Sequence, residues 1–326
     1  METIERYMEI ANEAIASTRI DKAPERLYEP INYTMKLGGK RLRPTLMMMS
    51  CEAFGCHYSM CLNQAVGLEY FHNFTLLHDD VMDNADMRRG MPTVHRKWDV
   101  NTAILSGDTM LTLAGQMIVE KKHGAKSRRL VELFNRTAIE VYEGQQYDMD
   151  FETRTDVSVD EYINMIRLKT SVLFGCACKM GAIVAGARVA DQNSIYDFAL
   201  NLGLAFQLQD DYLDVYGDPA TFGKAIGGDI LNAKRTFMLI SAYNAANDAQ
   251  KAELNRLLAI DTPERNAEKI EGVTRLYNEL GIPAICRAEI ERYSNLAVRS
   301  LDKIAFDRDD RKKFIELVNM LIKRDR

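Results

Sequence analysis

Apolar residues recur with the spacing of α-helices along almost the whole chain. This periodicity predicts helices near residues 2–18, 24–36, 41–55, 60–84, 101–121, 127–152, 158–168, 170–190, 192–216, 232–247, 249–259, 264–280, 284–304 and 308–323. The clearest breaks are Gly38-Gly39, Gly90-Met91-Pro92 and Gly217-Asp218-Pro219, and the longest predicted loop is 217–231. Because no Ser-, Pro- or Gly-rich linker is long enough to separate two domains, we expect one helical domain over residues 1–326.

Composition and charge exclude several classes of protein. Only 7 of 326 residues are proline, about 2% against a usual level of roughly 5%, which favours a mostly helical chain. The net charge of -5 argues against a nucleic-acid binder. No stretch approaches ~18 uninterrupted apolar residues, so we expect no membrane span. The chain starts with acidic residues where a secretory signal would be basic, and its six cysteines form no Cys-x-x-Cys pair, so we expect reduced thiols in a cytoplasmic protein.

Two apolar segments carry the same acidic motif. LLHDDVMDNADMRRG at residues 76–90 and FQLQDDYLDVYGD at residues 206–218 both contain D-D-x-x-D. Helical positions i and i+4 lie about 40° apart around the axis and roughly 6 Å apart along it. Asp79 therefore shares a helix face with Asp83, and the second motif repeats this arrangement. Because the rest of each segment is apolar, we expect both acidic faces to point inward. For either motif taken alone, an acidic helix face exposed to water is the alternative.

Buried carboxylates need a strong counter-charge, or they take up protons. Magnesium fits, because it prefers oxygen ligands and is often held by a few carboxylates together with substrate phosphates. We therefore expect several Mg²⁺ ions to bridge both acidic motifs to a diphosphate. The arginine pair Arg88-Arg89 lies just after the helix that carries the first acidic motif. A mobile pair at this position could hold diphosphate oxygens bidentately.

These motifs resemble those of the trans-isoprenyl diphosphate synthases, also called polyprenyl synthetases. The family pattern D-D-x-x-D-x-x-x-x-R-R-G is matched from Asp79 to Gly90, and the second pattern follows Phe-Gln at 206–207. Further matches occur in the family's order over roughly residues 38 to 236: GGKRLRP at 38–44, His72, KT at 169–170, Lys224 in FGKAIGGD and KRT at 234–236. The resemblance implies an all-α isoprenoid synthase fold, a barrel of helices around a deep apolar cavity, usually in a homodimer.

The resemblance also implies a reaction. An allylic diphosphate ionises, isopentenyl diphosphate attacks the carbocation, and a proton is lost, in this family to the released diphosphate. Magnesium, as three ions bridged by the substrate diphosphate, would stabilise the leaving group together with lysine and arginine side chains.

The family's roles can be carried over residue by residue. The metal ligands would be Asp79, Asp83 and Asp210, supported by Asp80, Asp211 and Asp214. The allylic diphosphate would be held by Arg88, Lys169, Lys224 and Lys234. Isopentenyl diphosphate would be held without metal by Lys40, Arg43, His72 and Arg89. Oxygens near the carbocation would come from Thr170 and Gln207, whereas we expect His78 and His95 to be structural.

Residues just before the first acidic motif can form the cavity floor in this family, and here they are Phe74 and Thr75. An aromatic ring at 74 should limit chain growth, because a prenyl tail cannot pass a well-packed ring without costly rearrangement. One aromatic residue at these floor positions, together with a D-D-x-x-D motif that has no extra residues inside it, is most similar to the pattern of archaeal geranylgeranyl diphosphate synthases. The expected product is therefore C20, with C15 close behind and C25 or longer left open.

Three other classes stay open. A class I terpene cyclase also ionises allylic diphosphates, but it normally carries an Asn/Ser/Glu metal triad and needs no isopentenyl site. A squalene- or phytoene synthase-like enzyme lacks the Arg-Arg-Gly and Lys-Thr set. A partner subunit that shapes another synthase commonly loses one acidic motif, whereas both are intact here.

Overall fold

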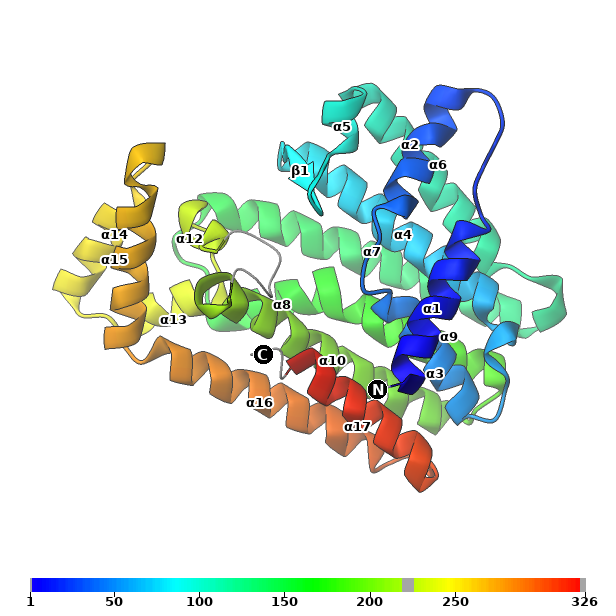
Figure 1. Ribbon diagram of the computed structural model, residues 1–326. Coiled ribbons are helices and arrows are strands. Elements are labelled where there is room, and N and C mark those ends of the chain that lie inside the picture. Colours follow the sequence, from blue (N-terminus) through cyan, green and yellow to red (C-terminus); the bar gives the residue numbers. More distant parts are fainter. Residues whose placement is uncertain (1, 219–225, 323–326) are drawn as a thin grey trace. The chain divides into compact units, whose positions relative to one another are not determined.

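The computed structural model describes residues 2–218 and 226–322 of the 326-residue chain (Figure 1). Its α-helices are α1 (Glu2–Ala16), α2 (Glu25–Lys36), α3 (Leu42–Ala53), α4 (Leu62–Met82), α5 (Val94–Lys97), α6 (Val100–Ile118), α7 (Lys126–Thr153), α8 (Val159–Ile166), α9 (Val172–Ala185), α10 (Val189–Tyr216), α12 (Gly228–Leu231), α13 (Phe237–Ala245), α14 (Asp248–Leu258), α15 (Asn266–Glu279), α16 (Ile282–Leu301) and α17 (Arg308–Ile322). A π-helix, Arg167–Ser171, joins α8 to α9, and three 3-10 turns lie at Tyr58–Met60, Lys121–His123 and Pro263–Arg265. Within the described ranges the only strands are β1 (Met87–Arg88) and β2 (Met91–Pro92), which pair antiparallel.

The predicted all-α class is confirmed. Two predicted boundaries are wrong in an informative way. The expected break near residue 169 is a π-helix instead, so that the chain stays helical from Val159 to Ala185. The helix expected from 232 begins only at Phe237, because the Thr236 side chain caps it by accepting a hydrogen bond from the backbone of Leu239.

The described chain divides into two compact units. Unit 1 comprises Met1–Arg136, Cys176–Tyr196 and Phe306–Lys313, and unit 2 comprises Thr137–Gly175, Asp197–Ala305 and Phe314–Arg326. Four of the five borders fall inside helices α7, α9, α10 and α17, and the fifth lies between α16 and α17. The single domain expected over residues 1–326 stays a prediction.

Helices α4 and α6 lie side by side in unit 1. Two glycines permit this close approach. A Cβ atom on Gly67 would lie 2.8 Å from the Cβ of Met117, and one on Gly107 would lie 2.2 Å from Nε2 of His78. The fully buried side chains of α3 and α4 complete this packing, among them Leu46, Met47, Met48, Leu68, Tyr70 and Phe71. The last turn of α4, which carries the first acidic motif, is therefore fixed by close helix packing.

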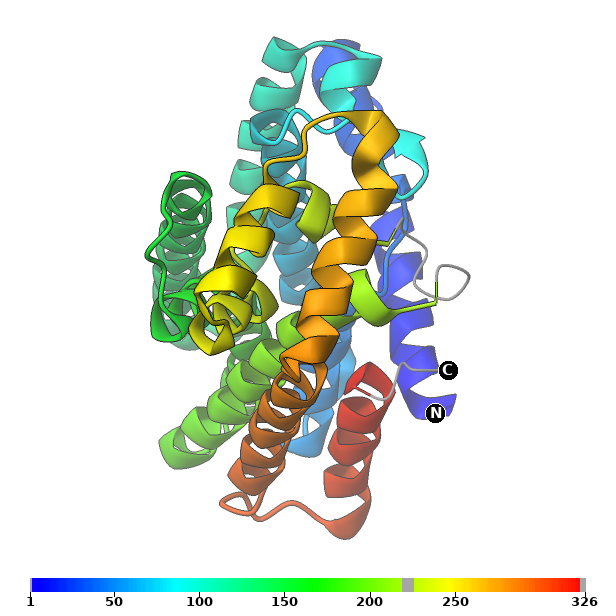
Figure 2. The same ribbon diagram turned by 90° about the vertical axis from the view of Figure 1, so that its left-hand side faces the viewer.

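Unit 2 has its own apolar core, built from α8, α10 and α13 to α16. Within it, α14 and α15 lie side by side (Figure 2). The buried Lys269 of α15 donates hydrogen bonds to the backbone oxygens of Leu231, at the end of α12, and of Ile260, just after α14. A lysine at two helix C-terminal ends satisfies carbonyl groups that have no partner within their own helices. This contact joins the end of the short helix α12 to α15 and to the end of α14.

Among the described residues, one run, Val159–Ala185, is long and apolar enough to cross a membrane by length and composition. Of its most apolar window, 78% is buried inside the protein. Core helices of water-soluble proteins meet the same criterion, so this run alone is weak support for a membrane span.

Candidate active site

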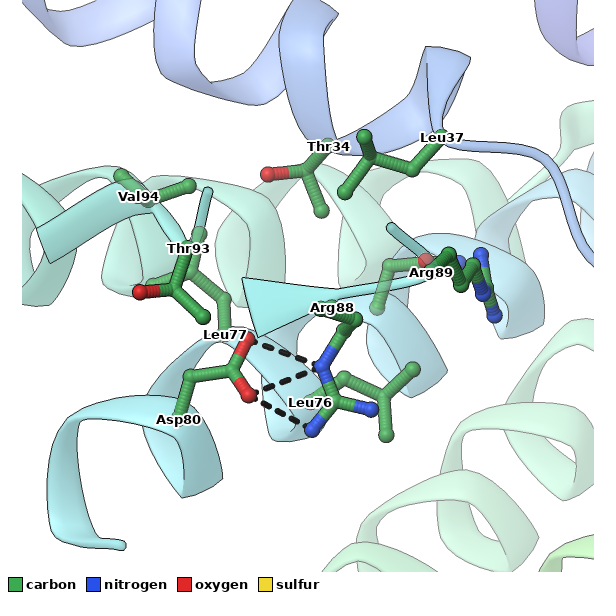
Figure 3. A pocket seen from close by; sticks show the side chains of 10 residues that line it. Thr34, Leu37, Leu76, Leu77, Asp80, Arg88, Arg89, Thr93 and Val94 are labelled. Atoms are coloured by element: carbon green, nitrogen blue, oxygen red, sulfur yellow. Dashed lines mark hydrogen bonds and ion pairs between the residues drawn. The ribbon is translucent and has the colours of Figure 1, made fainter. Parts of the chain in front are cut away.

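The first acidic motif lies at the C-terminal end of α4. Asp80 is only 5% exposed, whereas Asp79 is half-buried and Asp83, which caps the helix, is exposed. The guanidinium of Arg88 donates to both carboxylate oxygens of Asp80, with Nε 2.8 Å from each and a second nitrogen 2.6 Å from Oδ1 (Figure 3). The expectation that Asp79 and Asp83 point inward is therefore wrong for Asp83. The residue that points inward is Asp80, because Arg88 provides its counter-charge.

The two arginines lie in the β-hairpin formed by β1 and β2. Arg89 and Gly90 both have positive φ, +54° and +76°, as the two-residue type I′ turn between β1 and β2 requires. The side chains point in different directions: Arg88 reaches Asp80, and Arg89 donates to the backbone oxygen of Gly38 (Figure 3). Gly39 lies against the Arg89 guanidinium and has a φ of +142°, a backbone conformation that favours glycine. The expected mobility of the pair stays a prediction.

Cationic side chains gather around His72 of α4. Burial, followed by the charges of Arg43, Arg89, Arg88 and Arg41, holds the pKa of His72 well below its ordinary value. The imidazole is therefore neutral at neutral pH and its surroundings favour an anion.

Besides Asp80, which binds Arg88, a second carboxylate lies near this cationic cluster. The buried Glu69 accepts a hydrogen bond from Arg41 at 2.7 Å, and Arg41 also donates to Oδ1 of Asn12 and to the backbone oxygen of Met35. Burial lowers the pKa of Arg43 to about 10, with Glu69 opposing the shift and Arg89 adding to it. Arg41 and Glu69 were not among the sequence candidates, although Arg41 lies within GGKRLRP. Lys40, which was a candidate, is exposed.

Phe74 and Thr75 lie one to two turns before the first acidic motif. The Phe74 ring is buried, 5.7 Å from the ring of Phe71 and 4.8 Å from that of His78, measured between centroids. The Phe71 ring in turn meets Phe134 edge-on at 5.2 Å. The half-buried Thr75 donates its hydroxyl to the backbone oxygen of His72. Phe74 thus lies between Phe71 and His78 in a row of rings within unit 1 that meet at tilted or edge-on angles.

In unit 2, Lys169 and Thr170 lie on the π-helix Arg167–Ser171. Such π segments are rare and occur often at functional sites. Two glycines let neighbouring helices press against it. A Cβ atom on Gly144 of α7 would lie 2.3 Å from the backbone nitrogen of Lys169, and one on Gly203 of α10 would lie 2.7 Å from Cα of Ser171. The π-helix is therefore held between α7 and α10.

Asp148 of α7 links two of the predicted lysines. Its Oδ2 lies 2.6 Å from Nζ of Lys169 and 3.7 Å from Nζ of Lys234. Burial works to raise the pKa of Asp148, but Lys234 and Lys169 outweigh it and hold that pKa below its ordinary value. Asp148 was missed from the sequence, where EGQQYDMD looks like any polar helix face. Lys224, the third predicted lysine, lies outside the described residues.

The second acidic motif, on α10, repeats the burial pattern of the first. Asp211 is 5% exposed, whereas Asp210 and Asp214 are half-buried. Burial and the charge of Asp229 raise the pKa of Asp211, and hydrogen bonds from Tyr162 and Gln207 oppose this. Asp214 accepts the backbone N–H of Asp229 at 2.9 Å, which ties α10 to the start of α12.

Thr170 and Gln207 contact each other. The threonine hydroxyl donates to Oε1 of Gln207 at 3.0 Å, and the Gln207 amide donates to Oδ1 of Asp211 at 3.0 Å. The two predicted oxygens near the carbocation therefore belong to one hydrogen-bonded chain.

Within residues 2–218 and 226–322, no three Asp, Glu, His or Cys side chains lie close enough together to hold a metal ion by themselves. Each acidic motif by itself nevertheless offers carboxylates that water can reach, Asp79 and Asp83 in unit 1 and Asp210 in unit 2, and carboxylates are the hard oxygen ligands that Mg²⁺ prefers.

Residues 24–278 match the family model described as polyprenyl synthetase. The chain is 33% identical to a geranylgeranyl pyrophosphate synthase of Geoglobus acetivorans over 99% of both proteins. It is also 37% identical to a geranylfarnesyl diphosphate synthase of Natronomonas pharaonis, over 74% of this chain and 76% of that protein.

Solved structures of geranylgeranyl pyrophosphate synthases are also similar to this chain. A crystal structure of a geranylgeranyl pyrophosphate synthase is 44% identical, with a TM-score of 0.94 and full coverage of both chains. A geranylgeranyl pyrophosphate synthase from Corynebacterium glutamicum, complexed with isoprenyl diphosphate and magnesium, is 26% identical, with a TM-score of 0.85 and 99% coverage of both chains. The expected isoprenoid synthase fold and prenyltransferase class are thereby confirmed, and the chain belongs to the polyprenyl synthetase family.

Proposed function

We propose that the protein condenses isopentenyl diphosphate head-to-tail (1′-4) with an allylic diphosphate, giving a short-chain trans-prenyl diphosphate and diphosphate. The observation that carries this proposal is the arrangement on α4. Its last turn presents Asp79 and Asp83 for metal, while two turns earlier His72 lies among four arginines with excess positive charge. A diphosphate bound there needs no metal, which suits isopentenyl diphosphate. A class I cyclase would have no use for such a second site.

Isopentenyl diphosphate would be bound by Arg43, Arg89, His72 and the exposed Lys40. Arg89 is held by Gly38 and is in place before substrate arrives. Arg41 acts differently: with Glu69 it forms a buried pair that fixes the start of α3. Guanidinium groups are suited to a diphosphate, because they bind phosphate oxygens bidentately.

The allylic diphosphate would be bound by Lys169, Lys234, Arg88 and Lys224. Mg²⁺ ions, three in the family's pattern, would be held by Asp79, Asp83 and Asp210, and when bound they stabilise the departing diphosphate. A relative with magnesium and isoprenyl diphosphate bound supports divalent metal use.

The remaining aspartates act through their neighbours. Asp80 holds Arg88 and Asp214 holds the start of α12. Near the carbocation, the oxygens of Thr170 and Gln207 would stabilise positive charge without becoming nucleophiles.

We propose C20 as the main product, with C15 close and C25 or longer as the alternative. The buried ring of Phe74, backed by Phe71, supports a closed floor. The similarity to a geranylfarnesyl diphosphate synthase keeps C25 open.

We also propose a cytoplasmic homodimer. Three exposed apolar residues, Val100, Ile104 and Leu105, lie on α6 in unit 1. A second copy that covers this face would remove it from water, as in symmetric dimers generally. Size-exclusion chromatography with light scattering tests this proposal, because a monomer at micromolar concentration would contradict it.

The function is tested by product analysis. Purified protein is incubated with Mg²⁺, isopentenyl diphosphate and each allylic starter in turn, and the hydrolysed products are identified by mass spectrometry. A C15 or C20 alcohol that disappears with EDTA supports the proposal and decides the length. Longer chains would show that Phe74 does not close the cavity. A folded protein that elongates no starter would favour the cyclase or partner-subunit readings.

A further inference from the structure

A continuous chain of hydrogen bonds crosses unit 2. The phenol of Tyr162, on α8, donates to Oδ2 of Asp211, whose other oxygen accepts the Gln207 amide. The Gln207 carbonyl oxygen in turn accepts the hydroxyl of Thr170. Tyr162 is 3% exposed and Asp211 is 5% exposed, so water cannot easily replace either partner. Tyr162 has no counterpart in the motifs read from the sequence.

The direction of this chain is set at its buried end. Burial and the neighbouring Asp211 hold the pKa of Tyr162 well above its ordinary value, so the phenol keeps its proton and donates. Asp211 then accepts a hydrogen bond on each oxygen, from Tyr162 and from Gln207, and these two bonds oppose the rise in its pKa that burial and Asp229 cause. A glutamine amide has one acceptor and one donor end, so when its NH₂ group faces Asp211, its carbonyl oxygen must face Thr170.

We infer that Tyr162 is a positioning residue for the condensation: through Asp211 it fixes the Gln207 amide with its carbonyl oxygen, rather than its NH₂ group, toward Thr170. This inference rests on the proposed function, in which that oxygen stabilises the carbocation. The reversed amide would present a donor with partial positive charge where positive charge develops. Such a reversal lowers the rate of the chemical step without altering either diphosphate site.

Tyr162→Phe tests this directly, because it keeps the buried ring and removes only the hydroxyl. We expect kcat to fall about tenfold, while KM for both substrates changes by less than about twofold. The matched control is Tyr243→Phe, which removes a tyrosine hydroxyl that donates to Asn255 at 2.7 Å elsewhere in unit 2. This control should retain the wild-type kcat.

A double-mutant cycle separates positioning from a general structural effect. In a Gln207→Leu background, measured by single turnover, Tyr162→Phe should cause no further loss, because there is no amide left to orient. The same tenfold loss in both backgrounds would overturn the inference, and so would an unchanged kcat in the single variant. Wild-type protein that elongates no starter would overturn the proposed function and this inference with it. Active wild type with an unaffected Tyr162→Phe variant would overturn the positioning role alone.

Discussion

His72 should make the stability of the protein depend on pH below about 6.5, the ordinary pKa of histidine. In the folded protein its pKa lies well below this value, because burial and four arginines disfavour the imidazolium. In the unfolded chain the side chain is protonated as the pH falls through about 6.5. The unfolded state therefore binds more protons, so this contribution to stability is fully present above pH ~6.5 and is lost as the pH falls toward the folded-state pKa.

The magnitude follows from the linkage relation. If His72 stays neutral in the folded protein at pH ~5.5, protonation of the unfolded chain lowers the free energy of unfolding by RT ln(1 + 10), or about 1.4 kcal/mol. At pH ~7.5 the same term is below about 0.1 kcal/mol. Substitution His72→Gln keeps a neutral polar side chain and removes the titrating group.

Urea unfolding followed by circular dichroism at pH ~7.5, ~6.5 and ~5.5 measures the effect. Wild type should lose about 1.4 kcal/mol more than His72→Gln between the two extremes. The other four of the five histidines contribute equally to both proteins and cancel in the difference. Equal losses would show that His72 is not held neutral by its surroundings, and the description of this cluster as an anion site would lose its main support.

Binding of a diphosphate beside His72 should raise the pKa of its imidazole again. A bound anion favours the imidazolium, so that binding of inorganic diphosphate at pH ~7 should be accompanied by proton uptake. Calorimetry in two buffers of different ionisation enthalpy detects this uptake, which should be smaller in His72→Gln. Equal uptake in both proteins would place the bound diphosphate away from His72.

Three further predictions concern packing. Arg41→Met should lower the free energy of unfolding by about 3–5 kcal/mol, because it leaves Glu69 buried without its partner, and adding Glu69→Leu should recover much of the loss in urea unfolding. Gly203→Ala should cost about 1–3 kcal/mol and lower kcat, whereas Gly115→Ala, where nothing lies within 4 Å of the new Cβ, should be neutral or stabilising; equal effects would refute the close packing of the π-helix. Phe74→Ala should lengthen the product chain in the mass-spectrometric assay, and an unchanged distribution would remove Phe74 as the floor.

The positions of both acidic motifs could be predicted from sequence, since each D-D-x-x-D lies in a long apolar segment with helical periodicity. The direction in which each aspartate points could not. Spacing shows that Asp79 shares a face with Asp83, but the deeply buried aspartates are Asp80 and Asp211, each with its own hydrogen-bond donors. Two of those donors, Arg88 of β1 and Tyr162 of α8, reach the carboxylates only through tertiary packing.

Other site features have no sequence pattern strong enough to reveal them. Gly90 suggested a break, but the hairpin also requires Arg89 at positive φ, a conformation that arginine rarely adopts. The π-helix at Lys169 depends on glycines of α7 and α10 that allow close contact. Asp148 becomes a candidate only once its distances to Lys169 and Lys234 are known.

The charges of the two units differ in a way that bears on metal use. Around His72 in unit 1, the positive charges of four arginines exceed the negative charges of the two carboxylates near them, which belong to Glu69 and Asp80. In unit 2, Lys169 and Lys234 are already engaged by Asp148, and Lys234 also faces the buried Asp211. A diphosphate brought to the first group meets excess positive charge, whereas one brought to the second meets lysines already neutralised by carboxylates. This asymmetry gives a physical reason why isopentenyl diphosphate would bind without metal, whereas the allylic diphosphate, which must also leave, would need divalent cations.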